Sequence, residues 1–154
     1  MKVNKIVTQL ISEELEIKGA TLLSIEEAKK LPLRLREYEA WWWLRSPGYY
    51  PFNVTRVYRS GTVDSDGEDV DCNHGTVRPA LIIKNLESSN FTIGDCFTFG
   101  DKTFEIISEN LAFCLGDIGE CVFRKNYHAI DANDYVQSDV KKYIDKWFEE
   151  NRGE

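Results

Sequence analysis

Cys72 and His74 are the residues of this chain whose types and spacing come nearest to nucleophilic chemistry. A cysteine thiol attacks a substrate when a neighbouring imidazole accepts its proton and a third group orients that imidazole. One residue separates the two, so their side chains would share a face along a strand. The sequence identifies no third group. We therefore expect a protein that is not an enzyme and that uses no cofactor.

Metal binding is disfavoured by the spacing of the possible ligands. The chain has four cysteines and two histidines, with no C-x-x-C pair and no histidine at ligand spacing from a cysteine. With no export signal, the cysteines are expected to be reduced thiols. The acidic stretch Asp64–Asp71 does not follow the EF-hand pattern, because Gly67 comes too early and no bidentate Glu follows. We expect no metal site and predict that this stretch is a solvated hairpin turn.

The run Trp41-Trp42-Trp43 and the arginines Arg45 and Arg78 each have two interpretations. The tryptophans could stack on sugars or bases, or they could fill the core. In an extended chain Trp41 and Trp43 would share one face and Trp42 the other. The arginines could bind a carboxylate or phosphate as bidentate forks. Alternatively, each could donate to loop carbonyls or pair with a nearby acid.

The charge is strongly asymmetric along the chain. Residues 1–60 carry 10 basic and 7 acidic side chains, a net charge of +3, whereas residues 61–154 carry 9 and 19, a net charge of −10. This acidity repels nucleic acid and attracts a basic protein partner, although it could also serve solubility alone. The longest apolar run, Ala40–Leu44, is too short to span a bilayer, and the N-terminus does not resemble a signal peptide. We expect a cytoplasmic protein that binds neither nucleic acid nor membranes.

Apolar spacing and caps predict the elements that would position these residues. The 154 residues fit one domain, residues 1–154. An i, i+3, i+4 apolar stripe predicts a helix over residues 1–19. Ser24 and Glu27 form a capping box for a helix from Ile25 to about Leu31, and Pro32 prevents its continuation. Strands are expected over Asn53–Arg59 and Val77–Lys84, the second beginning near Pro79, which lacks a donor.

The second half of the chain has a different sequence pattern. A polar linker at residues 85–91 precedes residues 92–154, where turns separate short apolar runs. Four strands of a meander are predicted there: Cys96–Phe99, Thr103–Ser108, Leu111–Leu115 and Cys121–Arg124. A last helix begins at Ser138, a good N-cap, and carries an apolar stripe. Helices that flank short antiparallel strands indicate the α+β class.

Three motifs in residues 20–84 carry a resemblance to a known family. They are Trp42–Gly48 (WWLRSPG), Gly61-Thr62-Val63 and Val77–Leu81 (VRPAL). They resemble the signature of a bacterial and phage domain of unknown function of the DUF6273 type. Leu22–Ala28 (LLSIEEA) is similar to that family's L-L-S-x-E-E-A segment. The resemblance assigns structural signature roles to Trp41, Trp43, Arg45, Pro47, Gly48, Arg78 and Pro79.

The same resemblance implies a fold and a rearrangement. It implies a C-type-lectin-like fold, related to the variable proteins of diversity-generating retroelements and to formylglycine-generating-enzyme-like domains. Segments similar to Gly94–Gly100 and Ser138–Ile144 come first in the family but last here. We therefore expect a circularly permuted chain with its new junction at residues 86–91.

The function expected from the resemblance is recognition of another protein. In the resembling variable proteins the region around the acidic stretch forms the exposed binding face, and adaptable surfaces use Tyr, Asn and Arg. The candidate surface residues are Tyr49, Tyr50, Phe52, Asn53, Arg56, Tyr58, Arg59, Asp64, Asp66, Glu68, Asp69 and Asp71. We expect a non-enzymatic, phage-encoded or phage-derived protein-binding module that acts in the host cytoplasm.

Two alternatives remain open. The chain could be a small acidic phage inhibitor of a basic host nuclease, of anti-CRISPR type, that occupies a nucleic-acid groove. It could also be a lectin-like glycan-binding module, although the calcium motifs of sugar-binding C-type lectins are absent.

Overall fold

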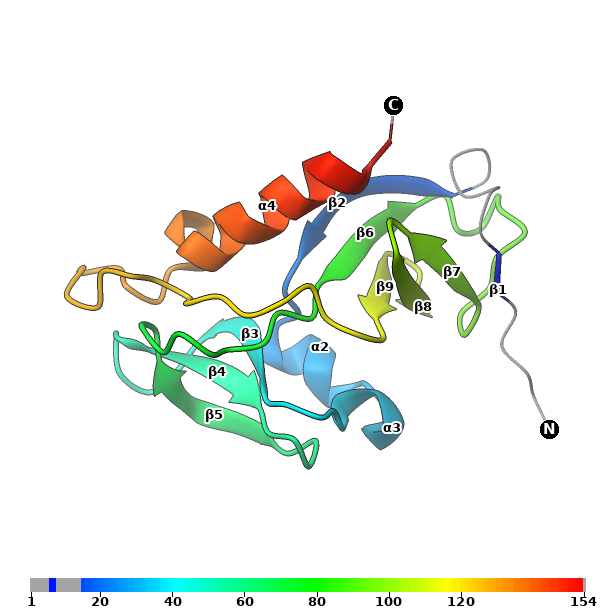
Figure 1. Ribbon diagram of the computed structural model, residues 1–154. Coiled ribbons are helices and arrows are strands. Elements are labelled where there is room, and N and C mark those ends of the chain that lie inside the picture. The colour runs from blue at the N-terminus through cyan, green and yellow to red at the C-terminus, as the bar shows by residue number, and fades with distance from the viewer. Residues whose placement is uncertain (1–5, 8–14, 154) are drawn as a thin grey trace.

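The computed structural model describes residues 6–7 and 15–153, which form a mixed α+β fold with two sheets (Figure 1). The larger sheet curls into a half-barrel of six strands. In spatial order these are β1 (Ile6–Val7), β7 (Cys96–Phe99), β8 (Lys102–Ser108), β9 (Leu111–Cys114), β6 (Ala80–Lys84) and β2 (Glu16–Thr21). The smaller sheet has the order β3 (Trp42–Pro47), β4 (Asn53–Val57) and β5 (Val63–Asp69). All pairings are antiparallel except the parallel pair β1 and β7.

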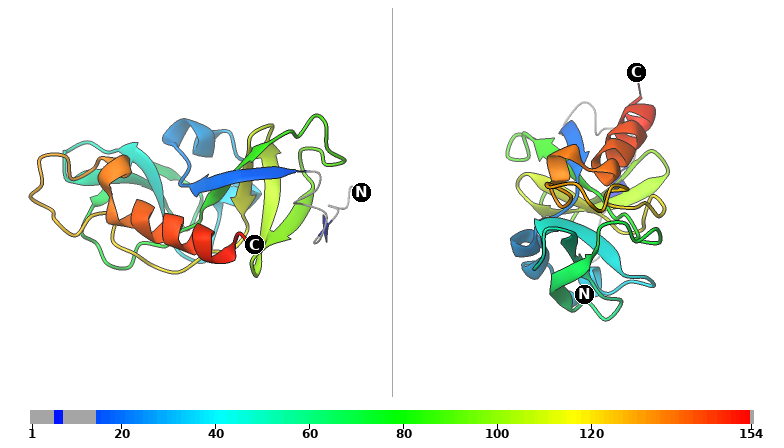
Figure 2. Two further views of the ribbon diagram at one scale, coloured as in Figure 1. Left: turned by 90° about the horizontal axis from the view of Figure 1, so that it is seen from above. Right: turned by 90° about the vertical axis from the view of Figure 1, so that its left-hand side faces the viewer.

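The C-terminal helix α4 (Asp139–Asn151) covers β2 of the half-barrel, and Figure 2 shows the two side by side. It begins where the sequence predicts, since Ser138 is the N-cap and its hydroxyl accepts from the N–H of Lys141. Val140, Ile144 and Phe148 form its buried stripe. A short 3-10 helix, η1 (Tyr135–Gln137), precedes it. The predicted final helix is therefore confirmed.

Two short helices lie between β2 and β3. The capping box is confirmed: Glu27 N–H donates to the Ser24 hydroxyl, and Ser24 N–H donates to the Glu27 carboxylate. The helix, α2 (Ile25–Lys29), ends slightly before the predicted limit. Pro32 ends that run and serves as the N-cap residue of α3 (Leu33–Arg36).

The helix predicted over residues 1–19 is wrong at the places where the structure describes this segment. Ile6–Val7 forms β1, and Glu16–Thr21 forms β2, which pairs with β6. The local pattern explains the error, because Leu15 and Ile17 alternate with polar residues at the period of a strand. The rest of the predicted helix, residues 1–5 and 8–14, lies outside the described residues.

Three further expectations are corrected. The acidic stretch is mostly the strand β5, not a hairpin turn, because it pairs with β4, where its Asp64 and Glu68 contact Arg56. Cys121–Arg124 is not a strand, because it joins residues 70–76 through two single backbone hydrogen bonds, from the N–H of Cys121 to Gly75 and from the N–H of Arg124 to Val70, while the neighbouring bridge belongs to Glu120. The strand predicted over Val77–Lys84 begins at Ala80. The other three strands of the predicted meander are confirmed, with ends shifted by one residue at most.

Strand β3 separates two clusters of buried side chains. Trp42 and Trp43 are both fully buried, but Trp42 packs with Val57 and Phe113, whereas Trp43 packs with Val54 and Phe123. Adjacent strand residues point to opposite faces, so one dipeptide contributes to both clusters. The predicted shared face of Trp41 and Trp43 is confirmed, since their rings meet edge to face with centroids 4.8 Å apart.

Candidate functional site

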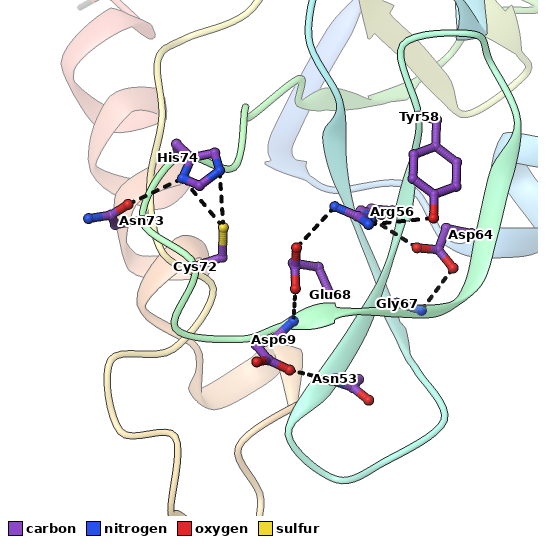
Figure 3. A network of polar contacts seen from close by, with 10 residues as sticks. All are labelled: Asn53, Arg56, Tyr58, Asp64, Gly67, Glu68, Asp69, Cys72, Asn73 and His74. Atoms are coloured by element: carbon purple, nitrogen blue, oxygen red, sulfur yellow. Dashed lines mark hydrogen bonds and ion pairs between the residues drawn. The ribbon is translucent and has the colours of Figure 1, made fainter.

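One side of the β3–β4–β5 sheet carries a polar and aromatic cluster centred on Arg56 (Figure 3). The Arg56 guanidinium carbon lies 4.8 Å from the ring centroid of Trp41 and 4.7 Å from that of Tyr58. Arg56 also donates to Asp64 at 2.9 Å and to Glu68 at 3.2 Å. We call these five residues the Arg56 cluster. Both carboxylates come from β5, so the register of β4 against β5 builds the cluster.

The electrostatics of the Arg56 cluster fix the arginine in place. Burial alone would lower the pKa of Arg56, but its contacts with Asp64, Tyr58 and Glu68 raise it overall. Burial would likewise raise the pKa of Asp64, but the N–H of Gly67 and the Arg56 guanidinium lower it below 3.8. Arg56 is therefore neutralised within the molecule, and the cluster presents a preordered surface rather than a free cation.

Replacing Asp64 with asparagine should remove stability that depends on pH. Because the folded state lowers the pKa of Asp64, its ionised form contributes stability above pH 3.8, and this contribution is lost as the pH falls through the folded pKa. We expect Asp64→Asn to cost about 1 kcal/mol at neutral pH and almost nothing near pH 2, measured by urea unfolding. Asp66→Asn on the same strand is the control, because the Asp66 side chain is exposed. An equal loss at both pH values would contradict the role given to the carboxylate.

The remaining predicted surface residues divide between exposed and structural positions. Tyr49 and Tyr50 are exposed in the β3–β4 turn, and Phe52 is half-buried beside them. Asn53 is buried and donates to the Asp69 carboxylate at 2.8 Å, so it joins β4 to β5 instead of facing a partner. Three further candidates, Arg59, Asp66 and Asp71, are exposed.

Cys72 and His74 come together, as their shared face predicted. The Cys72 sulfur lies 3.6 Å from each ring nitrogen of His74, and Nδ1 lies 3.3 Å from the Asn73 amide oxygen (Figure 3). Burial, the largest influence, raises the pKa of the Cys72 thiol. The thiolate is the form that acts as a nucleophile or metal ligand, and burial disfavours that form at Cys72.

Neither a metal cluster nor a membrane span is evident in the part of the chain that the structure describes. Within residues 6–7 and 15–153, no three His, Cys, Asp or Glu side chains gather closely enough to hold a metal ion. None of the helices in these same residues could cross a bilayer.

The two signature arginines donate to groups of their own chain. Arg45 donates to the carbonyl of Leu22 and to the carboxylate of Glu27. Arg78 is 2% exposed, and its four acceptors are backbone carbonyls, those of Leu35, Cys114, Leu115 and Gly116. Burial lowers the pKa of Arg78 to about 10, which leaves it protonated at neutral pH. These contacts match the second of the two interpretations drawn from the sequence.

The signature residues Pro47, Gly48 and Pro79 lie where strands begin and end. Pro47 is the last residue of β3, and the Pro79 carbonyl accepts from the N–H of Cys114. A Cβ on Gly48 would lie 2.3 Å from the carbonyl oxygen of Asp66. Only glycine permits this approach of the turn to β5, so Gly48 helps to shape the turn that carries Tyr49 and Tyr50.

A cavity that sequence reasoning missed lies between α2–α3 and the β8–β9 hairpin. Its volume is about 460 Å³, with a mostly aliphatic lining that includes Leu31, Leu35 and Ile106. Glu105, 4% exposed, accepts two hydrogen bonds from Arg34 at its wall. No local sequence signal joins these two residues, because they are 71 positions apart.

Comparison with known proteins gives one match. The model of a family described as a domain of unknown function, DUF6273, matches residues 9–85, a range that contains β2, the Arg56 cluster and β6. No curated protein and no solved structure matches the chain.

Proposed function

The chain belongs to the DUF6273 family, and from this premise we propose that it is a non-enzymatic, phage-encoded or phage-derived protein-binding module. The observation that carries the proposal is the Arg56 cluster, in which Trp41, Arg56 and Tyr58 are stacked and fixed by two carboxylates. Trp, Tyr and Arg are the residue types that dominate binding energy at protein interfaces. A surface that is already ordered loses little side-chain entropy when it binds.

We also propose that the fold is C-type-lectin-like and circularly permuted. Permutation requires that the ends of the domain lie close together. The contact between the C-terminal α4 and the N-terminal β2 supports it, as does the position of the junction, residues 86–91, in the loop between β6 and β7. Host cytoplasm is the proposed place of action.

Inhibition of a basic host nuclease is the alternative function. The strand β5 supports it, because four of its seven residues are acidic and it forms an edge of the smaller sheet. Such an edge would complement a basic groove that normally holds nucleic acid. Glycan binding is the third candidate, supported by the exposed rings of Tyr49 and Tyr50. Calcium-dependent binding to a glycan array would favour it.

Capture of partners from a bacterial lysate tests the proposed function. The tagged full chain is compared with Tyr58→Ala, which removes one ring of the Arg56 cluster, and with Ile82→Ala, an equally exposed residue of β6. We expect specific proteins to be captured by the wild type and by Ile82→Ala, and at least about fivefold less by Tyr58→Ala, since an interface anchor contributes more than 1 kcal/mol.

Two outcomes would decide against the binding module. Equal capture by all three proteins would show that the Arg56 cluster is not part of the interface. Turnover of a substrate by the purified chain would show that it is an enzyme. Capture of nucleases that is lost at about 0.5 M salt would favour the inhibitor, because salt screens long-range charge attraction.

A further inference from the structure

Five aromatic rings from two distant segments form a continuous row at one end of the molecule. Tyr49, Tyr50 and Phe52 lie in the β3–β4 turn, whereas Tyr127 and His128 lie in the loop between β9 and α4. Successive ring centroids are 4.7, 5.3, 4.8 and 5.3 Å apart. We call these five residues the aromatic strip. Tyr49 is 72% exposed and Tyr50 52%, so this end of the strip is open to solvent.

Hydrogen bonds hold the two segments of the aromatic strip together. The side-chain amide of Asn133 donates to the carbonyls of Tyr50 and Asn53, which ties the loop to the turn. The N–H of Tyr49 donates to the carbonyl of Asp66 on β5. Arg124 donates to the Asp131 carbonyl and carboxylate, which closes the loop on itself. The rings are therefore ordered before any partner arrives.

Carboxylates lie beside the aromatic strip. The backbone carbonyl of Asp66 accepts from the N–H of Tyr49, and Asp69 and Asp71 flank Val70, whose N–H donates to the carbonyl of Phe52 at 2.9 Å. Asp69 and Asp71 also raise the pKa of Tyr127, although burial is the larger cause. Asp66 and Asp71 are exposed. Lys125 is exposed in the same loop, and Arg124 is already paired with Asp131.

This combination of rings and acids selects the chemistry of a partner. A tyrosine face attracts an arginine or lysine cation within about 6 Å of its centroid, and a neighbouring carboxylate adds a charge-assisted hydrogen bond. A polyanion would be repelled by the same carboxylates, and a purely apolar partner would desolvate them without compensation.

We propose that the aromatic strip binds an arginine- or lysine-bearing segment of a partner protein. The inference rests on the proposed function and adds to it the location and the chemistry of a second contact region, beside the Arg56 cluster.

Fluorescence anisotropy with synthetic peptides tests the proposal on the full chain. The probe is a labelled peptide of alternating arginine and glycine, compared with peptides of equal length that carry lysine, glutamine or glutamate instead. We expect binding of the arginine and lysine peptides only. Tyr50→Ala should weaken that binding about fivefold, the equivalent of about 1 kcal/mol, and Asp71→Asn about two- to threefold.

Matched variants separate the strip from the rest of the surface. Ile82→Ala shortens an exposed apolar side chain of β6, and Glu87→Gln removes an exposed carboxylate in the loop between β6 and β7. Both residues lie outside the strip and outside the Arg56 cluster, so both variants should bind the arginine peptide like the wild type. Since Asp71 is exposed, Asp71→Asn should stay folded, so its peptide affinity still tests the proposal even if a tyrosine variant unfolds.

The outcomes are distinct from those of the lysate experiment. Three results would contradict the proposal that the aromatic strip binds an arginine- or lysine-bearing segment. They are absence of arginine-peptide binding, equal binding of the glutamine peptide, and unchanged binding by both Tyr50→Ala and Asp71→Asn. If partner capture still depended on Tyr58, the proposed function would stand without it. Conversely, strip-dependent peptide binding with no partner capture would count against the proposed function alone.

Discussion

Arg78→Ala is expected to lower the free energy of unfolding by about 4 kcal/mol or more. The substitution leaves four carbonyl oxygens without their donor, and an unsatisfied buried polar group costs about 1–3 kcal/mol. It also empties a space in which the guanidinium carbon lies 4.3–4.9 Å from the ring centroids of Tyr38, Trp42 and Phe113. Urea unfolding followed by tryptophan fluorescence measures the change.

Two matched variants identify the cause of the loss at Arg78. Arg78→Lys keeps the positive charge but not the planar fork of donors. We therefore expect it to lower the free energy of unfolding, but by less than Arg78→Ala does. Arg45→Lys, at a half-buried arginine with only two acceptors, should cost about 1 kcal/mol or less. If Arg78→Ala were as stable as the wild type within about 1 kcal/mol, the bonds to the four carbonyls would not hold these loops together.

Gly75→Ala is expected to destabilise the protein by about 3 kcal/mol. The added methyl would lie 2.0 Å from Nε1 and 2.3 Å from Cε2 of Trp43. Trp43 cannot retreat, because it is fully buried and donates from Nε1 to the Cys121 carbonyl at 2.9 Å. Overpacking a close-packed core typically costs about 1–3 kcal/mol. Because the methyl would be attached to the backbone of Gly75 and would meet a ring that cannot move, we expect a cost at the upper end of that range. Thermal and urea unfolding measure the effect.

Gly19→Ala is the control for Gly75→Ala. Its added methyl would have Ile82 Cδ1 as its nearest neighbour at 3.9 Å, an ordinary contact. We expect a change within about 0.5 kcal/mol, since alanine also reduces the entropy of the unfolded chain. Similar losses at both glycines would show that the clash with Trp43 is not the cause.

The sequence by itself determined the features that depend on near neighbours. The capping box of Ser24 and Glu27, the start of α4 at Ser138 and three strands of the meander all follow from patterns within a few residues. The alternation of Trp41 and Trp43 was predicted for the same reason, because side-chain direction along a strand is set by the local backbone. The family was also identified from contiguous motifs.

Only the tertiary structure decided which distant groups meet. Where the structure describes residues 1–19, strands replace the predicted helix, since β2 pairs with residues of β6 that lie 59–68 positions away. The acidic stretch forms β5 because it pairs with β4, where the carboxylates of Asp64 and Glu68 meet Arg56. The contact of Phe52 with Tyr127 and the bonds of Arg78 likewise join segments that no short window of sequence connects. Periodicity and caps report local backbone energies, whereas these contacts depend on how the sheets pack.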